Sequence, residues 1–362
     1  MTCYTGVIEG NKLYTVHEGL GLLMEYDLQK FSYKILCSIF SSMPQDFVRV
    51  KGLFIDSGII YIILLGSWKV IEYYIDSKCI KINGSSSDYL NKQFLVEKIT
   101  CYEKKIWLLP CYIGDTIKIF DFEKKTYIEK KAIGQYLIEE GKNINLDIFA
   151  EYETTKEGIV YAIVYESAYV VSINMVTEEY RLYDIGKDKK LSSINFDGKN
   201  YWLSYFDSNA IEKWSPLYGV LETYDIPQIK VDNRRQPIRM VYERKNKIYI
   251  IPTFMPDIIV LDKEKEEMPY ICLKGKQKRI YKNGDRFQFL SSLMYKNMVI
   301  LLPHAVNEFV LIDLETGLIK NIESRLTKFD IRRYIINPQL QYGMTNEIFG
   351  WGIKEFINDI VL

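Results

Sequence analysis

The feature that most constrains the fold is a strand pattern that occurs seven times along the 362-residue chain. The clearest copy runs from Lys104 to Lys130, where Trp107 opens an apolar strand, Pro110 ends it, and Phe120-Asp121 closes the next strand before a charged turn. An Asx side chain at such a position hydrogen-bonds the backbone two residues on, which fixes a chain reversal. The repeat therefore predicts a chain built by stacking one antiparallel unit.

The seven copies align on the residue that opens the second strand of each unit. These residues are Tyr14, Tyr61, Trp107, Tyr161, Trp202, Tyr249 and Ile300. They are on average about 48 residues apart, within the spacing of about 40–50 residues that propeller blades have. The chain is rich in aromatic residues, which favour pleated surfaces. We expect four antiparallel strands per unit and no helical periodicity between them.

Over residues 1–324 the chain resembles the β-propeller repeat proteins of the kelch-like and WD40-like kind. It has neither the Gly-Gly doublet of kelch repeats nor the Gly-His and Trp-Asp pairs of WD40 repeats, so the resemblance implies the architecture and carries over no catalytic residue. We expect an all-β fold, a seven-bladed β-propeller of four-stranded antiparallel blades. The segment from Cys3 to Ile8 is predicted to be the first inner strand, so that the ring closes without strand exchange.

Residues 325–362 form a separate tail in this interpretation. Apolar residues recur there at helical spacing and predict a helix over about 347–361; they are Phe349, Ile353, Phe356, Ile357 and Ile360. The helix either packs on the propeller or docks a partner. Eight blades are the alternative if this tail supplies strands.

Composition narrows the function classes. Lys and Arg total 47, as do Asp and Glu, so the net charge is zero and a nucleic-acid partner is not expected. The six cysteines form no CxxC pair, there is no recognisable signal peptide, and no apolar run reaches the roughly 18 residues of a membrane helix. We expect a cytoplasmic monomer with free thiols, no membrane contact and no cofactor.

Loops of a propeller alternate between its two faces, so the loop after each second strand shares a face with the connection between units. Three consecutive connections are basic and predict one positively charged sector that binds an anionic partner. Its residues are Lys187, Lys189, Lys190, Arg234, Arg235, Arg239, Lys274, Lys276, Lys278, Arg279 and Arg286. The alternative is that these lysines and arginines only keep the loops soluble.

The loops within the units supply further candidates on the same face. Trp68, Tyr112 and Tyr205 are predicted to contact a partner by stacking, although aromatic side chains that cap each blade's core are the alternative. The chain's two histidines, His17 and His304, lie in the first and seventh units, and with Glu18 and Glu308 they are weak candidates for a metal site.

No nucleophile elbow, P-loop or dinucleotide fingerprint is present, and no catalytic residue is assigned. The sequence therefore favours a non-catalytic scaffold that presents one loop face to a protein, acidic or phosphorylated, or to another anionic partner. The alternative is an enzyme that acts on a sugar or other small molecule at the mouth of the channel, with loop acids such as Asp115, Asp207 and Asp257.

Overall fold

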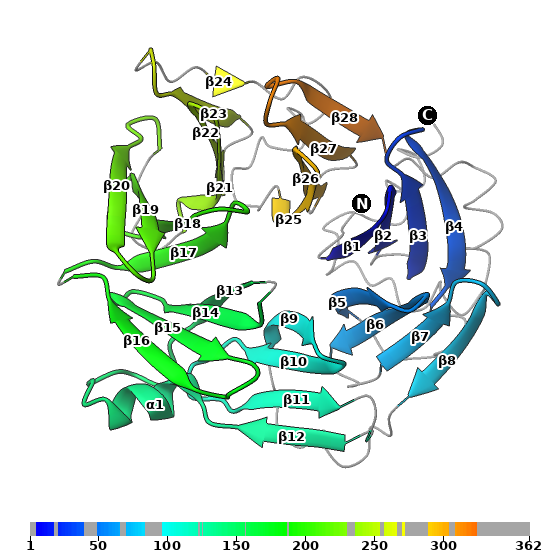
Figure 1. The fold of residues 1–362 in the computed structure, drawn as a ribbon, viewed down its shortest axis with the longest axis horizontal. Helices are drawn as coiled ribbons and strands as arrows, with labels where there is room; N and C mark the ends of the chain where they lie inside the picture. Colours follow the sequence, from blue (N-terminus) through cyan, green and yellow to red (C-terminus); the bar gives the residue numbers. More distant parts are fainter. Residues whose placement is uncertain are drawn as a thin grey trace, which may run out of the picture. The chain divides into compact units, whose positions relative to one another are not determined.

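The structure is a computed structural model of the chain. It describes residues 5–17, 21–39, 49–65, 70–83, 96–121, 124, 126–155, 157–186, 188–229, 236–253, 257–265, 270–271, 289–303 and 308–323. These residues form seven four-stranded antiparallel sheets, and within each sheet the strands follow one another in chain order (Figure 1). The prediction of seven all-β units is confirmed.

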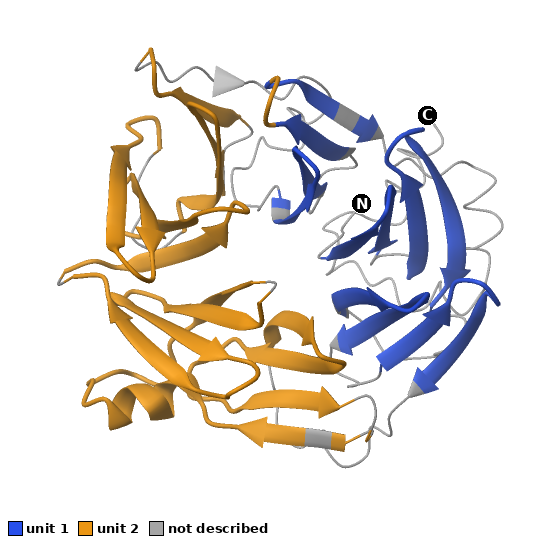
Figure 2. Cartoon of the chain, viewed as in Figure 1, with its two compact units in different colours: residues 1–91, 289–313, 317–362 blue, residues 92–288, 314–316 orange. Residues whose placement is uncertain are grey.

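The sheets are numbered here as blades 1 to 7 in chain order, and the chain divides into two compact units (Figure 2). Unit 1 comprises residues 1–91, 289–313 and 317–362, and therefore holds blades 1, 2 and 7. Unit 2 comprises residues 92–288 and 314–316, and holds blades 3 to 6. Each unit is described by itself.

In unit 1, blade 1 consists of β1 (Gly6–Glu9), β2 (Lys12–His17), β3 (Leu22–Asp27) and β4 (Ser32–Ser38). Blade 2 consists of β5 (Arg49–Asp56), β6 (Ile59–Leu65), β7 (Val70–Tyr74) and β8 (Cys79–Asn83). Blade 7 consists of β25 (Phe289–Tyr295), β26 (Met298–Pro303), β27 (Glu308–Asp313) and β28 (Ile319–Glu323).

In unit 2, blade 3 consists of β9 (Val96–Tyr102), β10 (Lys105–Pro110), β11 (Ile117–Asp121) and β12 (Thr126–Lys130), and helix α1 (Ile133–Glu139) follows it. Blade 4 consists of β13 (Ala150–Thr154), β14 (Ile159–Val164), β15 (Tyr169–Asn174) and β16 (Tyr180–Asp184). Blade 5 consists of β17 (Leu191–Phe196), β18 (Tyr201–Tyr205), β19 (Ala210–Ser215) and β20 (Gly219–Asp225). Blade 6 consists of β21 (Ile238–Arg244), β22 (Lys247–Pro252), β23 (Ile258–Asp262) and β24 (Tyr270–Ile271).

Burial explains why the second strand of each unit carries the clearest sequence signal. All seven alignment residues, from Tyr14 to Ile300, lie on second strands and are buried. In β14 every residue after the first is buried, because a blade packs against a neighbour on each face, and both sets of alternating side chains are then covered. The fourth strands are more exposed: four of the seven residues of β20 are exposed and none is buried.

The turn residues behave as the sequence predicts. Asp27 Oδ1 accepts hydrogen bonds from the backbone amides of Gln29 and Lys30, and Asn174 Oδ1 accepts the equivalent pair from Val176 and Thr177. Each side chain thus occupies the donors that the reversal leaves without a ladder partner.

The first and last blades pack against each other within unit 1. Residues of both share one apolar core, in which the rings of Tyr26 and Phe309 meet edge to face with centroids 4.7 Å apart. All four strands of blade 1 come from the N-terminal end of the chain and all four of blade 7 from residues 289–323. The prediction that no strand is exchanged between them is confirmed.

Helix α1 corrects the expectation that no helix separates the blades. It has seven residues, too few to produce a recognisable 3.6-residue repeat, and it buries Ile133, Gly134 and Leu137 against the core between blades 3 and 4. The predicted tail helix at about 347–361 lies outside the described residues. Within the described part of the chain, no helix has the length and apolar character needed to cross a membrane.

Candidate functional site

Strand direction brings the starts of the first strands to one edge of unit 2. Because each sheet is antiparallel, the first strand begins where the second strand ends, and the four first strands β9, β13, β17 and β21 are neighbours in turn. We call this the loop edge of unit 2. It is defined by the start of each first strand and by the residues that follow each second strand.

A buried polar cluster centred on Glu151 lies at the loop edge. Glu151 is the second residue of β13, and its Oε2 accepts hydrogen bonds from Tyr165 Oη at 2.9 Å, Gln236 Nε2 at 2.9 Å and Arg239 Nη1 at 3.2 Å. The Glu151 side chain is 10% exposed and that of Arg239 is 17% exposed. Gln236 also joins blade 5, since its Nε2 donates to the backbone carbonyl of Ser192 at 2.9 Å.

Burial and charge shift the pKa values of this cluster in defined directions. Burial raises the pKa of the Glu151 carboxyl; the Arg239 guanidinium opposes that rise, and the carboxylate of Glu97 adds to it. Burial and the Glu151 charge raise the pKa of the Tyr165 phenol well above its ordinary value. Tyr165 is therefore a neutral hydrogen-bond donor to Glu151. The Glu151 carboxylate is buried, and burial disfavours its charged form. Such groups concentrate at functional sites.

Glu97 and Cys111 extend the cluster into blade 3. Glu97 is the second residue of β9, and Cys111 directly follows β10; the Cys111 thiol lies 3.7 Å from Glu97 Oε2. The backbone carbonyl of Cys111 accepts a hydrogen bond from Ala150 N at 2.9 Å, beside Glu151. The loop within blade 3 is therefore attached to the start of blade 4.

An aromatic pair is formed by the residues next in sequence to Cys111 and to the start of β13. The rings of Tyr112 and Phe149 lie 4.6 Å apart between centroids, and the two residues form an antiparallel β-bridge. Phe149 is 44% exposed and directly precedes the Ala150–Glu151 start of β13. An exposed aromatic side chain beside buried polar groups is a combination that binding sites favour.

Two buried oxygens near this edge have no hydrogen-bond partner among the residues that the structure describes. They are Thr253 Oγ1 and Asp257 Oδ1, which flank the loop between β22 and β23. Thr253 N donates to Pro237 O at 3.1 Å, next to Gln236. A buried oxygen without a donor costs free energy, so these atoms call for a donor from outside the described residues.

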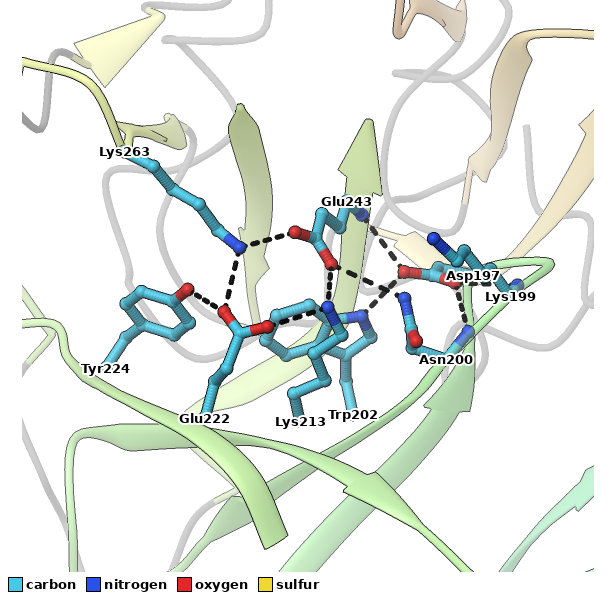
Figure 3. A network of polar contacts seen from close by, with 9 residues as sticks. All are labelled: Asp197, Lys199, Asn200, Trp202, Lys213, Glu222, Tyr224, Glu243 and Lys263. Carbon is cyan, nitrogen blue, oxygen red and sulfur yellow. Dashed lines mark hydrogen bonds and ion pairs between the residues drawn. The ribbon is translucent and has the colours of Figure 1, made fainter. Parts of the chain in front are cut away.

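A second polar network joins blades 5 and 6 at the opposite end of β21 (Figure 3). Lys213 Nζ lies 2.8 Å from Glu222 and 2.7 Å from Glu243, and Lys263 Nζ lies 2.9 Å from Glu222 and 2.5 Å from Glu243. Asp197 Oδ2 accepts the indole N–H of Trp202 at 2.7 Å and the backbone N–H of Glu243 at 3.2 Å. Two lysines and two glutamates neutralise one another here, so we interpret this network as one that stabilises the contact between the two blades.

Five of the predicted partner-binding residues have described side chains, and four of them are half-buried or buried. Lys189 pairs with Glu212 at 2.6 Å, and Arg239 with Glu151, so both cations are neutralised within the protein. Tyr205 is not part of an exposed rim: it is 3% exposed and donates its hydroxyl to Glu212. The ring of Tyr205 belongs to a core cluster of buried apolar residues. Tyr112 is half-buried at the loop edge.

Lys190 is exposed at the start of blade 5. The other members of the basic sector and Trp68 lie outside the described residues; they are Lys187, Arg234, Arg235, Lys274, Lys276, Lys278, Arg279 and Arg286. Of the metal candidates, Glu18 and His304 also lie outside them, and for Glu308 only the backbone is described. No cluster of three or more potential metal ligands occurs in the described residues.

His17 ends β2 in unit 1 as a neutral imidazole. It is 7% exposed, its Nδ1 has no hydrogen-bond partner within the described part of the chain, and burial lowers its pKa to about 3. Its pairing with His304 stays a prediction.

Glu97, Glu151 and Gln236 are not among the site residues predicted from the sequence, which are loop aromatics and acids, the two histidines and the basic residues of the connections. Glu151 and Glu97 belong to first strands, whereas Arg239, Tyr112 and the loop acid Asp257 are residues of this edge that the sequence does predict as candidates. The one available signal is a glutamate at the second position of the first strand in both β9 and β13.

Fold and comparisons agree on the class of protein: the chain is a seven-bladed β-propeller. YCF48 from Cyanidioschyzon merolae matches with a TM-score of 0.58 at 10% identity, over 88% of this chain and 96% of that one. YCF48 bound to D1 peptide matches with a TM-score of 0.56 at 10% identity, over 86% and 90%. Virginiamycin B lyase from Staphylococcus aureus matches with a TM-score of 0.56 at 10% identity, over 84% and 92%. At these identities the likeness shows the fold alone. No protein family and no curated protein matches the sequence.

Proposed function

We propose that the protein is a non-catalytic binding propeller that recognises a protein partner at the loop edge of unit 2. The observation that supports the proposal is the buried Glu151–Arg239 pair. Burying two charges costs desolvation free energy, and apolar side chains of similar volume at these positions would not incur that cost. This pair is drawn from blades 4 and 6 and lies beside the exposed ring of Phe149. One similar propeller structure is named as bound to a peptide, which is consistent with such a role.

The buried oxygens of Thr253 and Asp257 lie at the same edge, and among the described residues neither has a hydrogen-bond partner. The opposite end of β21 lacks this character: in the Glu243 network the charges of lysines and glutamates balance. We therefore assign recognition to the loop edge and stability to the other end.

The alternative is an enzyme acting on a sugar or small molecule. The raised pKa of Glu151 favours it, since a general acid needs such a shift. Against it, three donors and the Arg239 charge hold Glu151 Oε2 in place, which suits a fixed binding group better than one that transfers protons.

The proposal is tested by affinity capture with the full chain, followed by mass spectrometry, on three forms of the protein. They are the unmodified chain, Glu151→Gln and the matched control Glu243→Gln, which alters a buried carboxylate in an inter-blade network at the other end of β21. We expect a partner that the unmodified chain and Glu243→Gln retain and that Glu151→Gln loses by at least roughly tenfold.

Thermal unfolding establishes that both variants are folded. Should Glu151→Gln unfold, Phe149→Ala replaces it, because an exposed side chain can be truncated at little cost to the core. Equal recovery of every partner by the unmodified chain and Phe149→Ala would contradict the proposal.

A preference for an anionic partner remains a proposal for the basic connections, and it rests on their sequence. Its test is simultaneous charge reversal at Arg234, Arg235, Lys278 and Arg279; unchanged partners would contradict it. We also propose a cytoplasmic location, because Cys37 and Cys79 are free thiols of the kind that reducing compartments maintain.

A further inference from the structure

The hairpin that joins β19 to β20 carries the most exposed of the large apolar side chains in the described part of the chain. Leu217 is 78% exposed and Tyr218 is 79% exposed, and both lie in the turn. Val220 and Leu221 continue this surface on β20, at 38% and 46% exposure. We call these four residues the hairpin patch. An exposed run of large apolar side chains on a folded protein is typical of a surface that binds another protein.

The turn holds the tip of the hairpin in one conformation. Ser215 Oγ accepts a hydrogen bond from Leu217 N at 3.2 Å. Gly219 closes the turn at a φ of 76°, a backbone conformation that residues with a side chain rarely adopt. Because the tip is already ordered, a partner that contacts Leu217 and Tyr218 meets little further ordering cost.

A β-bulge in β20 decides how this edge strand can be contacted. Trp214 of β19 pairs with Val220. Lys213 pairs with Glu222, so Leu221 has no partner residue on β19. β20 is the last strand of its sheet, and a bulge in an edge strand redirects side chains and discourages the addition of another strand. We therefore expect contact through the side chains of the hairpin patch rather than through the backbone.

A hollow of about 170 Å³ lies beside the hairpin patch, between blades 4 and 5. Its walls include the rings of Tyr183 and Trp214, which meet edge to face with centroids 5.3 Å apart. A cavity of about 150 Å³ can hold benzene, so this hollow has room for the ring of one tyrosine. Asp184 and Ser215 also line it, and their oxygens can accept the hydrogen bond that a buried tyrosine hydroxyl usually donates.

The tip of the hairpin and the hollow are neighbours on one surface. Tyr218 lies in sequence between Pro216 and Gly219, which both line the hollow, yet its own ring is exposed to solvent. A two-fold axis between two copies of the chain can place each protruding ring in the other copy's hollow. Such an isologous contact uses the same surface on both copies, so ring and hollow are matched twice.

The size of the hairpin patch fits a second copy. Large apolar side chains have roughly 150–250 Å² to bury, so the four exposed fractions leave on the order of 450 Å² accessible. A standard interface buries about 800 Å² on each partner, of which roughly 60% is apolar. The hairpin patch therefore supplies about the apolar share that one copy contributes to a dimer of standard size.

We propose that the hairpin patch is the interface of a two-fold symmetric homodimer, in which Tyr218 of each copy enters the hollow beside Trp214 of the other. A dimer takes the place of the monomer expected from the sequence. The turn of the hairpin lies at the end of blade 5 opposite to the loop edge, because β19 begins at the loop edge and runs away from it. The inference therefore does not depend on the binding function proposed for the loop edge.

Sedimentation velocity on the full chain, from about 1 to 100 μM, tests the proposal. We expect a reversible dimer whose dissociation constant rises at least roughly tenfold in Tyr218→Asp. Val176→Asp is the matched control and should leave that constant unchanged, because Val176 is 54% exposed in the corresponding turn of blade 4. Thermal unfolding checks that both variants are folded, and Tyr218→Ser replaces Tyr218→Asp if the charge destabilises the chain. A monomer over the whole range, or a dimer that the Tyr218 variant does not weaken, overturns the proposal.

Photo-crosslinking tests where the two copies meet. Leu217→p-benzoylphenylalanine places the probe beside an unmodified Tyr218, and equal amounts of unlabelled and heavy-nitrogen-labelled chains are mixed and irradiated. We expect crosslinked peptides that join a heavy chain to a light one and that contain Tyr183 or Trp214. Crosslinks confined to single chains, or mixed crosslinks that map to another surface, contradict the assignment. Neither measurement uses a loop-edge partner, so a failed affinity capture and a failed dimer are separate results.

Discussion

Glu151 and Arg239 are 88 residues apart in the sequence, yet Glu151 Oε2 and Arg239 Nη1 are separated by 3.2 Å. Glu151 is the second residue of the first strand of blade 4 and Arg239 is the second residue of the first strand of blade 6, so the ion pair spans blade 5 at the loop edge of unit 2. Gln236 completes the link by bonding to Glu151 and to Ser192 of blade 5.

The first prediction concerns the energetic coupling of this pair. Arg239→Gln leaves the Glu151 carboxylate buried without its cation, and we expect the free energy of unfolding to fall by about 3 kcal/mol. The double variant Glu151→Gln/Arg239→Gln should recover most of that loss, because no charge then remains buried. Urea unfolding of the four members of the cycle measures the coupling.

The exposed pair Arg244–Glu315 is the control for that cycle, since its partners are 47% and 41% exposed and 3.5 Å apart. Arg244→Gln should cost no more than about 0.5 kcal/mol. Equal losses for the two arginine variants would show that burial does not govern the Glu151 pair.

The second prediction concerns Asn195, whose amide bridges blades 5 and 6. Its Nδ2 donates to Val241 O at 2.6 Å and its Oδ1 accepts from Val241 N at 2.8 Å, in a buried setting. Asn195→Ala leaves both backbone groups without these bonds, and we expect a loss of about 2–3 kcal/mol in chemical unfolding. Asn200→Ala, which removes a longer bond of 3.4 Å to Glu243, should cost less than about 1 kcal/mol.

The third prediction tests how α1 holds the loop of blade 3. A Cβ on Gly134 would lie 2.4 Å from Leu146 Cδ2 and 3.1 Å from Ile113 O, where Gly134 N already donates to that carbonyl at 2.7 Å. Gly134→Ala should therefore lower the free energy of unfolding by about 1–3 kcal/mol. Adding Leu146→Ala removes the closest contact and should restore part of the loss; no restoration would mean that the backbone of Ile113 sets the limit.

The fourth prediction is a pH dependence that originates at His17. Burial lowers the pKa of the folded imidazole to about 3, below its unfolded value of about 6.5, so the unfolded state takes up the proton first. The stability due to neutral His17 is complete above about pH 6.5 and is lost as the pH falls toward 3. Between pH 6.5 and 5 we expect a loss of about 2 kcal/mol relative to His17→Phe, measured by urea unfolding at each pH. Parallel curves for the two proteins would exclude His17 as the source.

The sequence determines the architecture because the repeated signal is local. Each second strand has a buried aromatic or apolar residue, such as Tyr14 or Trp202, and these residues recur about every 48 positions. The third strand ends in an Asx residue, such as Asp27, in five of the seven blades. Each blade must bury both faces of its second strand and close a tight turn. The same residue types therefore recur in every copy and indicate the same structure. Helix α1 escapes notice because two turns of helix carry too little periodicity.

The candidate site depends on contacts that local sequence does not encode. Lys189 and Arg239 look like free cations in basic connections, but Glu212 and Glu151 neutralise them, and Tyr205 lies inside its blade rather than at a rim. Glu151 itself reads as one acid among the chain's 47 acidic residues. Pairing between different blades is set by where whole sheets pack, and residues 88 positions apart have no shared pattern to reveal it.

The β-propeller class and the number of blades can therefore be predicted from the sequence, because strand period and turn chemistry act over a few residues at a time. Tertiary packing alone brings Glu151, Arg239, Gln236 and Tyr165 together and pairs the ring of Tyr112 with the exposed ring of Phe149. Those relationships arise from the packing of neighbouring blades, where burial makes each charge depend on partners that are distant in sequence.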